Sequence, residues 1–512
     1  MSHRPTLLVL PVAAALATAV SAHAQPALIV ARTVYPTGAA IPSITPGQTV
    51  LPNGALAVGD GSFVNVFKNE TPDPSFGVTT GIVIDRRTLT GAILSSYSPG
   101  TNVPLVTSFS SKSELGLNVS QDGRLVTFMG YAAPLNALDV SNSNTAYFTD
   151  PSNPVTNAAN PLPTVSRAIG VFDLSTGAIT STSVNAYSGN NGRGAVLATN
   201  GNFYMAGNAG NSANSSPLAT GTVFSTLSDN TGVQMIARGT SGNTTVVGQV
   251  NGVFGSTNGY QRGFSIAQLG VAADKTGKDD NFRGLTLYNN TLYATKGSGG
   301  NGVNTVYQVG TAGTLPTAAT AATTPITVLP GFLSVTSGKP DVSTHPFGLW
   351  FGDASTLFVA DEGDGTITGG ANAGLGEYKL QGGSWNKVAT FSAGLIGHAS
   401  YSQGLPWNIF TDGLRNLTGL ANPDGSFQLW ATTATTSNDT GHDLGADPNE
   451  LVTITVNADG SASPFRVLET AAAGERLGGV AIAGAAVVPE PETYGLVLAG
   501  LAMTGVLMRR RR

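Results

Sequence analysis

A short unit recurs along this chain: a glycine, a brief apolar strand, a polar turn, and a second strand that carries an aromatic residue. Clear copies begin at Gly116, Gly194, Gly284, Gly348 and Gly419, and weaker copies begin at Gly54 and Gly479. These glycines lie about 60 to 90 residues apart, which is enough for a four-stranded sheet with long loops in each unit. A glycine at the start of an inner strand is expected where strands crowd around a common axis. The repeat therefore predicts a β-propeller.

The sequence between these glycines reads as short strands and tight turns, and nothing in it reads as a long amphipathic helix. Val306–Val309 and Leu451–Val456 are rich in β-branched and aromatic residues. Asp122-Gly123, Asn200-Gly201 and Asp424-Gly425 are turn signals that reach a positive φ easily. We predict an all-β fold, a β-propeller of seven blades, with six blades as the nearest alternative. A right-handed β-helix or a pair of β-sandwiches would show shorter, more uniform repeats or none.

The last copy of the unit is incomplete. After Gly479 only the strand Val480–Ala483 precedes a change in the character of the sequence. The N-terminal strand Leu28–Val30, or the segment Ser62–Phe67, would have to complete its sheet. Closing the ring with strands from both ends of the chain removes exposed sheet edges. We therefore expect the two ends of the body to pair.

Composition indicates a folded body and limits its partners. Charged residues make up only 11% of the chain, but 41% of the residues are hydrophobic and can bury a core. The net charge is −5, which gives no support for binding to nucleic acid or to an anionic membrane surface. The chain has no cysteine, so disulfides and thiolate metal sites are excluded.

The C-terminal end has three consecutive parts: Pro489-Glu490-Pro491, an uncharged run from Tyr494 to Met508, and the cluster Arg509, Arg510, Arg511 and Arg512. The apolar run is shorter than the ~20 residues that cross a bilayer comfortably, and the arginines follow the positive-inside preference. This order of parts resembles the PEP-CTERM sorting signal of Gram-negative bacteria, which a membrane protease called exosortase is thought to process. The resemblance implies that Pro489, Glu490 and Pro491 are the recognition motif and that a short apolar helix follows. An ordinary C-terminal tail anchor is the alternative.

The N-terminal end has the pattern of a cleavable export signal. His3 and Arg4 precede the apolar stretch Leu7–Val20, and Ala22-His23-Ala24 has the small-x-small pattern that signal peptidase reads. We predict a signal peptide at 1–24, a propeller body at 25–487 and a sorting signal at 488–512. The expected partners are the Sec machinery, signal peptidase, exosortase and an exopolysaccharide. The expected route is a transient inner-membrane anchor, followed by the outer surface or extracellular matrix.

Basic residues stand shortly before the inner strand in five units. They are Arg193, Arg283, His345, Arg415 and Arg476. Because inner strands begin at one mouth of a propeller channel, these side chains could form a basic ring around an acidic ligand or a metal-bound oxyanion. Their offsets from the unit glycine are one, three or four residues, and Glu114 takes the same place in another unit. The alternative is that they cap strands and pair with the loop carboxylates Asp280, Asp341 and Asp412.

Metal and catalytic signals are weak. The histidines His345, His398 and His442 could meet at a propeller centre to hold a metal. The acidic stretches Asp361–Gly365 and Asp439–Glu450 have spaced oxygens and glycines but lack the EF-hand spacing. No cofactor is required by the sequence, and calcium is left open. The sequence has no Gly-x-Ser-x-Gly elbow, no His-Glu-x-x-His motif and no phosphate loop.

Two short segments resemble repeats of known propeller families. His345–Phe351 is similar to strands of the NHL and lactonase-like propellers, and Asp122–Val126 is similar to TolB-type repeats. Each covers a single unit, so neither implies an activity. Two function classes follow. One is a noncatalytic binding or structural protein of the cell surface or matrix, linked to exopolysaccharide or biofilm. The other is a secreted propeller hydrolase or lyase that acts at the channel mouth through His345 and the nearby arginines.

Overall fold

The computed structural model describes most of the body of the chain. The described residues are 26–35, 45, 47–50, 56–58, 78–109, 111–138, 140–146, 164–209, 230–248, 280–297, 303–333, 343–400, 404–439, 442 and 444–484. The predicted signal peptide, the apolar C-terminal helix and the weak repeat at Gly54 lie outside them. Within these ranges, no helix combines the length and the apolar character needed to span a membrane.

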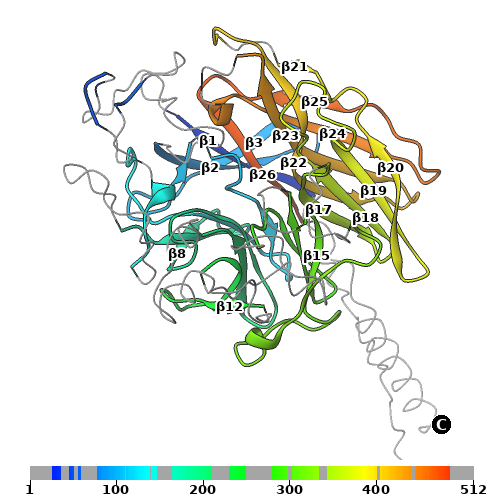
Figure 1. Ribbon diagram of the computed structural model, residues 1–512, viewed down its shortest axis with the longest axis horizontal. Helices are drawn as coiled ribbons and strands as arrows, with labels where there is room; N and C mark the ends of the chain where they lie inside the picture. Colours follow the sequence, from blue (N-terminus) through cyan, green and yellow to red (C-terminus); the bar gives the residue numbers. More distant parts are fainter. Residues whose placement is uncertain are drawn as a thin grey trace, which may run out of the picture.

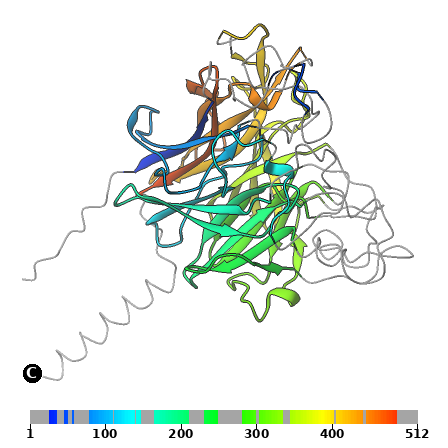
Figure 2. The same ribbon diagram turned by 90° about the vertical axis from the view of Figure 1, so that its left-hand side faces the viewer.

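Six antiparallel sheets follow one another around a central axis, and each is one blade of a propeller (Figures 1 and 2). Blade 1 contains β1 (Ala27–Val34), β2 (Thr79–Arg87), β3 (Ile93–Tyr97), β4 (Thr107–Ser108) and β26 (Glu475–Ala483). Blade 2 contains β5 (Asn118–Val119), β6 (Leu125–Tyr131), β7 (Arg167–Asp173) and β8 (Ile179–Val184). Blade 3 contains β9 (Gly192–Leu197), β10 (Asn202–Gly207), β11 (Gly232–Ala237) and β12 (Thr245–Val247).

The other three blades come from the second half of the chain. Blade 4 contains β13 (Leu285–Tyr288), β14 (Thr291–Lys296), β15 (Thr305–Val309) and β16 (Ile326–Val328). Blade 5 contains β17 (Pro346–Asp353), β18 (Thr356–Asp361), β19 (Gly374–Gln381) and β20 (Ser384–Phe391). Blade 6 contains β21 (Ala399–Ser400), β22 (Ile409–Ala421), β23 (Phe427–Ser437), β24 (Glu450–Val456) and β25 (Arg466–Thr470). In the described connections lie three short 3-10 helices: η1 (Val140–Asn142), η3 (Ala321–Thr323) and η4 (Leu444–Ala446).

The prediction of an all-β propeller is confirmed, but the prediction of seven blades is wrong. In the described residues, the strands that follow the first weak repeat and the strand of the last repeat belong to one sheet. β2 and β3, which follow the first weak repeat, join β26 of the last repeat through β1. The sequence count therefore assigned two blades to what is one blade in the folded chain.

Ring closure occurs between the two ends of the body, as predicted. β1 pairs antiparallel with β26, from Ala27 opposite Ala483 to Val34 opposite Glu475. In Figure 1 these strands come from opposite ends of the colour scale and lie side by side. The strand Leu28–Val30 therefore completes the last blade, and the alternative segment Ser62–Phe67 lies outside the described residues.

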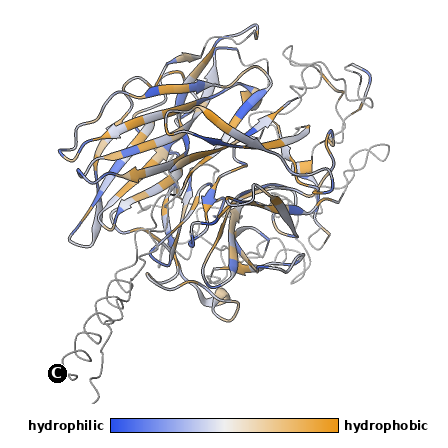
Figure 3. Cartoon of the chain, turned by 180° about the vertical axis from the view of Figure 1, so that it is seen from behind, coloured by the Kyte–Doolittle hydropathy of each residue, from blue (hydrophilic) through white to orange (hydrophobic). Residues whose placement is uncertain are grey.

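The hydrophobic core is divided among the interfaces between blades. Because side chains alternate across a strand, each blade can present an apolar face to both of its neighbours. Val196 of β9 and Leu285 of β13 belong to one such cluster, and Ile29 of β1 and Phe128 of β6 belong to another. Within the described residues, each of the six blade interfaces has a cluster of this kind. Apolar and polar segments accordingly alternate along the strands in Figure 3.

The predicted turns adopt the expected backbone. Gly123, Gly201 and Gly425 have φ values of 71°, 80° and 82°. At the β13–β14 turn, Asn289 and Asn290 both have positive φ, at 46° and 52°. Side chains of this kind tolerate the left-handed region, so the turn residues determine where each hairpin reverses.

Candidate binding site at the channel mouth

The inner strands of the six blades surround a central channel. A cavity of about 260 Å³ lies between them, and residues of β26, β5, β9, β13, β17 and β22 line it. The unit glycines are needed for this close approach. A Cβ atom on Gly348 would lie 2.5 Å from the carbonyl oxygen of Arg415, and one on Gly284 would lie 2.1 Å from that of Phe347. Crowding of the backbones explains these glycines, as the sequence predicted.

The inner strands pack against one another at equivalent positions, which form a ring around the channel. In blade 6 the residue at this ring position is not the glycine that the sequence repeat predicts. Gly348 packs against Arg415, Asn416 and Leu417, so Asn416 occupies the ring position of that blade. Gly419 lies three residues further along the strand, where a Cβ would meet the ring of Trp350 at 2.8 Å. Gly419 matches the sequence repeat, but β22 is a long strand with register shifts between Thr411 and Leu417. Arg415 therefore lies one residue before the ring position, and not the four residues that the repeat glycine Gly419 implied.

This correction places three arginines at the same step of three inner strands. Arg193, Arg283 and Arg415 each directly precede the ring position, and their exposed fractions are 4%, 9% and 6%. Arg193 and Arg283 line the channel cavity. The predicted basic ring therefore has three members in register, although their role in binding remains a prediction.

Arg193 links blade 3 to the start of blade 4. Its Nη1 donates a hydrogen bond of 2.6 Å to the carbonyl oxygen of Phe282 and another to Oδ1 of Asn281. Its Nε donates to Oδ1 of Asn191 at 3.2 Å. These contacts hold the guanidinium in one orientation at the mouth of the channel.

Arg415 pairs with a carboxylate of the neighbouring blade. Its Nε donates to Oε2 of Glu362 at 3.0 Å, and the two side chains are 7% and 15% exposed. Burial acts to raise the pKa of Glu362, but the positive charges of Arg283 and Arg415 together hold this pKa below its usual range. The charge of Lys112 acts in the same direction. Glu362 is therefore an ionised carboxylate among several cations.

A second carboxyl group beside this cluster behaves differently. Burial raises the pKa of Asp412 to about 7, and the negative charge of Glu362 adds to the shift. Its Oδ2 accepts a hydrogen bond from the backbone N–H of Gly365 at 3.1 Å. Its Oδ1 is buried and has no hydrogen-bond partner within the described part of the chain. Two neighbouring carboxyl groups at this mouth thus have pKa values shifted in opposite directions.

The remaining predicted ring residues lie nearby but out of register. Arg476 lies on β26, three residues before Gly479, and borders a small pocket together with Glu114. Glu114 accepts hydrogen bonds from Oγ1 of Thr107 at 2.6 Å and from the hydroxyl of Tyr131. Burial raises the pKa of Glu114, and these hydrogen bonds oppose the shift. Leu115, and not Glu114, directly precedes Gly116, so Glu114 is one step out of register with the three arginines.

His345 meets the first acidic stretch through its backbone. Its N–H donates to Oδ2 of Asp361 at 2.7 Å, and its carbonyl oxygen accepts from the N–H of Glu362 at 3.0 Å. Oδ1 of Asp361 accepts from the N–H of Gly363 at 3.0 Å. The carboxylate that suggested a calcium loop is thus occupied by backbone donors in this structure.

The three histidines have separate surroundings. Nδ1 of His398 lies 3.3 Å from Oε1 of Glu450, whereas the ring of His442 stacks on Trp407 at 3.6 Å between centroids. Nε2 of His442 lies 3.1 Å from Oδ2 of Asp447. In the described residues no group of three or more His, Asp or Glu side chains is placed to hold a metal ion.

Sequence reasoning missed the contribution of Lys112 and the contrast between Glu362 and Asp412. In the sequence, Glu362 lies in an acidic stretch and Asp412 is a predicted loop partner of the basic residues. Their contrast depends on burial and on charges from other blades, which no local pattern encodes. Lys112 stands in a polar segment before β5, and its surroundings in the sequence do not distinguish it from a surface lysine.

Comparison with known proteins identifies the C-terminal end of the chain. Residues 487–512 match the family model described as the PEP-CTERM protein-sorting motif. The resemblance inferred from Pro489, Glu490 and Pro491 is thereby confirmed. No curated protein matches the chain.

Solved structures give only distant likenesses. A hypothetical selenium-binding protein from Sulfolobus tokodaii is 11% identical, with 90% of this chain and 94% of that chain covered and a TM-score of 0.35. The GH74 enzyme of Niastella koreensis is 13% identical, with 77% and 47% covered and a TM-score of 0.29. An acylaminoacyl peptidase of Pyrococcus horikoshii is 8% identical, with 76% and 41% covered and a TM-score of 0.29. Similarities with TM-scores this low do not indicate a function for this chain.

Proposed function

We propose that this chain, an exported protein with a PEP-CTERM sorting motif and a six-bladed propeller body, is a noncatalytic binding protein of the cell surface or extracellular matrix. Its proposed ligand is an acidic group of an exopolysaccharide, such as the carboxylate of a uronic acid. The observation that carries the proposal is the common position of Arg193, Arg283 and Arg415 at one mouth of the channel.

The chemistry of these side chains fits a carboxylate. A guanidinium presents several N–H donors in one plane and can bind both oxygens of a carboxylate at once. Electrostatic attraction is stronger at a partly buried site than in water, because the local dielectric constant is lower. Since the arginines stand on strands of different blades, the rigid ring would hold them in place before the ligand arrives.

The direction of the inner strands supports an outward-facing site. The arginine mouth is the end of the channel that carries Arg193, Arg283 and Arg415. β26 runs from Glu475, near this mouth, to Ala483, and Ala27 of β1 lies opposite Ala483. Both ends of the described body are therefore on the face away from the arginines. A membrane anchor joined beyond Gly484 would leave the arginine mouth directed away from the bilayer.

Binding to an oligogalacturonate at low salt, measured by calorimetry, tests the ligand. We expect Arg283→Met to weaken binding by tenfold or more, since one buried charge-assisted contact contributes roughly 1.5–3 kcal/mol. Arg124→Met is the matched control, because Arg124 is exposed in the β5–β6 turn. Equal losses in both variants, or no binding by the unaltered protein, would contradict the proposal.

Deleting Val488 to Arg512 tests the sorting step. We expect the shortened protein to be exported but absent from its usual surface or matrix location, as followed by cell fractionation. A shortened protein with an unchanged location would refute processing by exosortase. An Arg124→Met variant of full length should be located as the unaltered protein is.

A hydrolase or lyase acting at the channel mouth is the second candidate. It is favoured by one observation, the opposite pKa shifts of Asp412 and Glu362 beside Arg415. Carboxyl groups whose surroundings separate their pKa values are typical of acid and base pairs in active sites. Release of new chain ends from a polyuronate, lost in Asp412→Asn and kept in Asp424→Asn, would support this candidate. Lack of turnover by the unaltered protein would remove it.

His345 can be tested in the same assay. The sequence predicts a role for His345 beside the arginines in such a reaction. If His345→Ala abolishes the release of chain ends, the imidazole takes part in the reaction. If the variant retains full turnover, Asp412 and Glu362 are the better assignment.

A further inference from the structure

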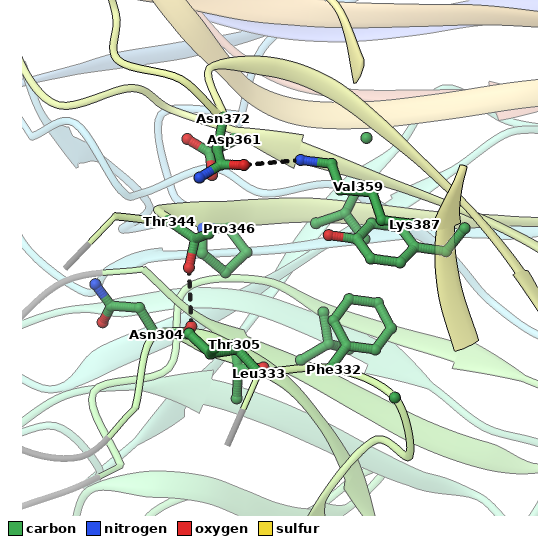
Figure 4. Close-up of a pocket in the computed structure, with 14 residues that line it drawn as sticks. Asn304, Thr305, Phe332, Leu333, Thr344, Pro346, Val359, Asp361, Asn372 and Lys387 are labelled. Carbon is green, nitrogen blue, oxygen red and sulfur yellow. Dashed lines mark hydrogen bonds between the residues drawn. The ribbon is translucent and has the colours of Figure 1, made fainter. Parts of the chain in front are cut away.

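A second cavity lies between blades 4 and 5, apart from the central channel. Its volume is about 440 Å³, within the ~300–1,000 Å³ typical of small-molecule sites. Blade 4 contributes β15 and the loop after β16, and blade 5 contributes β18, β19 and β20 (Figure 4). None of the five predicted ring residues is among the residues that line it.

One side of this cavity is apolar and aromatic. The rings of Phe332 and Tyr378 stack with centroids 4.3 Å apart and an interplanar angle of 23°. Val306 and Val359, which are buried in the core between the two blades, also line the cavity. The cavity is therefore a place where the hydrophobic interface between blades opens toward the surface.

The other side carries hydrogen-bonding groups from both blades. Lys387 donates from Nζ to Oδ1 of Asn372 at 2.9 Å, and Thr344 donates from Oγ1 to the carbonyl oxygen of Asn304 at 3.1 Å (Figure 4). Thr305 is 2% exposed, and its Oγ1 has no hydrogen-bond partner among the residues that the structure describes. A buried hydroxyl of this kind costs free energy unless a ligand or a water satisfies it.

The charges of this polar side compensate one another. Asp361 is 7% exposed and lies within electrostatic range of Lys387. Burial lowers the pKa of Lys387, and the carboxylate of Asp361 opposes that shift. One cation and one anion leave no net charge for a ligand to balance, so the cavity favours an uncharged polar ligand. The arginine mouth of the channel has the opposite preference.

We propose that this inter-blade cavity binds a neutral sugar ring. A pyranose has an apolar face of C–H groups and an edge of hydroxyls, which match the Phe332–Tyr378 side and the Thr305–Asn372 side. Carbohydrate hydroxyls both donate and accept, so they can accept from the second N–H of the Asn372 amide, which uses one N–H to donate to the carbonyl oxygen of Ser343 at 2.9 Å. They can also bond to Oγ1 of Thr305. This assignment does not depend on the ligand of the channel mouth.

Saturation-transfer NMR on the purified chain tests the site, with methyl glucoside, methyl galactoside and methyl mannoside as probes. We expect at least one probe to bind with a millimolar dissociation constant. Asn372→Leu should weaken that binding roughly tenfold, about the effect of the hydrogen bonds that it removes. Asn386→Leu is the matched control, because Asn386 is exposed on β20 and does not line the cavity.

A second variant and a second ligand make the outcome decisive. Thr305→Val keeps the shape of the side chain, leaves no hydroxyl to satisfy and should also weaken sugar binding, while a thermal melt confirms folding. Oligogalacturonate binding should be unchanged in Asn372→Leu and weakened tenfold or more in Arg283→Met, which separates the two sites. Failure of all three glycosides to bind, or equal binding by Asn372→Leu and Asn386→Leu, would overturn the assignment.

Discussion

Arg415 donates a hydrogen bond of 3.0 Å from Nε to Oε2 of Glu362, across the interface between blades 5 and 6. Both side chains are largely withdrawn from water, at 7% and 15% exposure. A buried pair of this kind adds little net stability, because each ion loses hydration when it is buried. Removing one partner is costly, however, since the other charge then stays buried with less compensation. The channel mouth is consequently sensitive to single charge changes.

We predict that Arg415→Met lowers the free energy of unfolding by about 1.5–3 kcal/mol, the usual contribution of a hydrogen bond to a charged group, because Glu362 would stay buried with only Arg283 and Lys112 to compensate its charge. Adding Glu362→Gln should recover part of that loss, so the double variant is more stable than the sum of the single changes implies. Urea denaturation measures the free energy of unfolding of each variant, with Arg124→Met as the exposed control. An Arg415→Met variant as stable as the unaltered protein would contradict the burial of this pair.

The pKa of Asp412 predicts a particular dependence of stability on pH. Its folded value of about 7 lies above the value of 3.8 expected for the unfolded chain. The folded protein therefore keeps a proton that the unfolded chain has released, and this group makes the fold less stable as pH rises from about 4 to about 7. The loss is at most roughly 4–5 kcal/mol, at about 1.4 kcal/mol for each pKa unit.

Asp412→Asn removes this loss. We expect its melting temperature to rise relative to that of the unaltered protein as pH increases from 5 to 8. Asp424→Asn is the control. Hydrogen bonds from Ser426 lower the pKa of Asp424, so its contribution is already complete above pH 5. If the Asp412→Asn difference does not change between pH 5 and 8, the carboxyl group of Asp412 is ionised throughout.

Gly348→Ala should destabilise the fold by roughly 1–3 kcal/mol, the usual cost of overpacking a filled site. The added Cβ would lie 2.5 Å from the carbonyl oxygen of Arg415 and 2.8 Å from the amide nitrogen of Leu417. Gly81→Ala in β2 is the matched control, because nothing lies within 4 Å of its Cβ position. We expect that variant to be neutral or slightly stabilised. Equal chemical denaturation curves for both variants would contradict the close approach of β17 and β22.

Ring closure can be tested with two isoleucines of blade 1. Ile29 on β1 has no exposed surface, whereas Ile93 on β3 is 51% exposed. Ile29→Ala should cost about 2–5 kcal/mol through the cavity that it leaves. Ile93→Ala should change the free energy of unfolding by less than about 0.5 kcal/mol. If guanidinium denaturation shows similar costs for both, β1 does not pack in the closing blade as described.

The repeat made much of the fold predictable. Its hairpins depend on local chemistry, since Asp122-Gly123 and Asn289-Asn290 reverse the chain through positive φ angles that few other residues reach. The pairing of the strand Leu28–Val30 with the last repeat followed from the missing partners of Val480–Ala483. The sorting motif is also readable from sequence, because Pro489, Glu490 and Pro491 are recognised as a linear signal.

The number of blades and the register of the inner strands were decided by the folded ring. Two partial repeats can close one blade or begin two, and the choice depends on how β1, β2 and β26 pack together. In blade 6 the ring position falls on Asn416 and not on Gly419, because the register shifts of β22 move the strand relative to its repeat.

The sequence by itself determined that the chain forms β hairpins in a closed series and that its C-terminal end carries a sorting signal, because both depend on residues adjacent in the chain. The tertiary structure alone decided which charges meet. The shifted pKa values of Asp412 and Glu362, and the cavity between Phe332 and Asn372, arise where separate blades come together. Burial and electrostatic interaction depend on distance in space, and the propeller sets those distances only when its ring is complete.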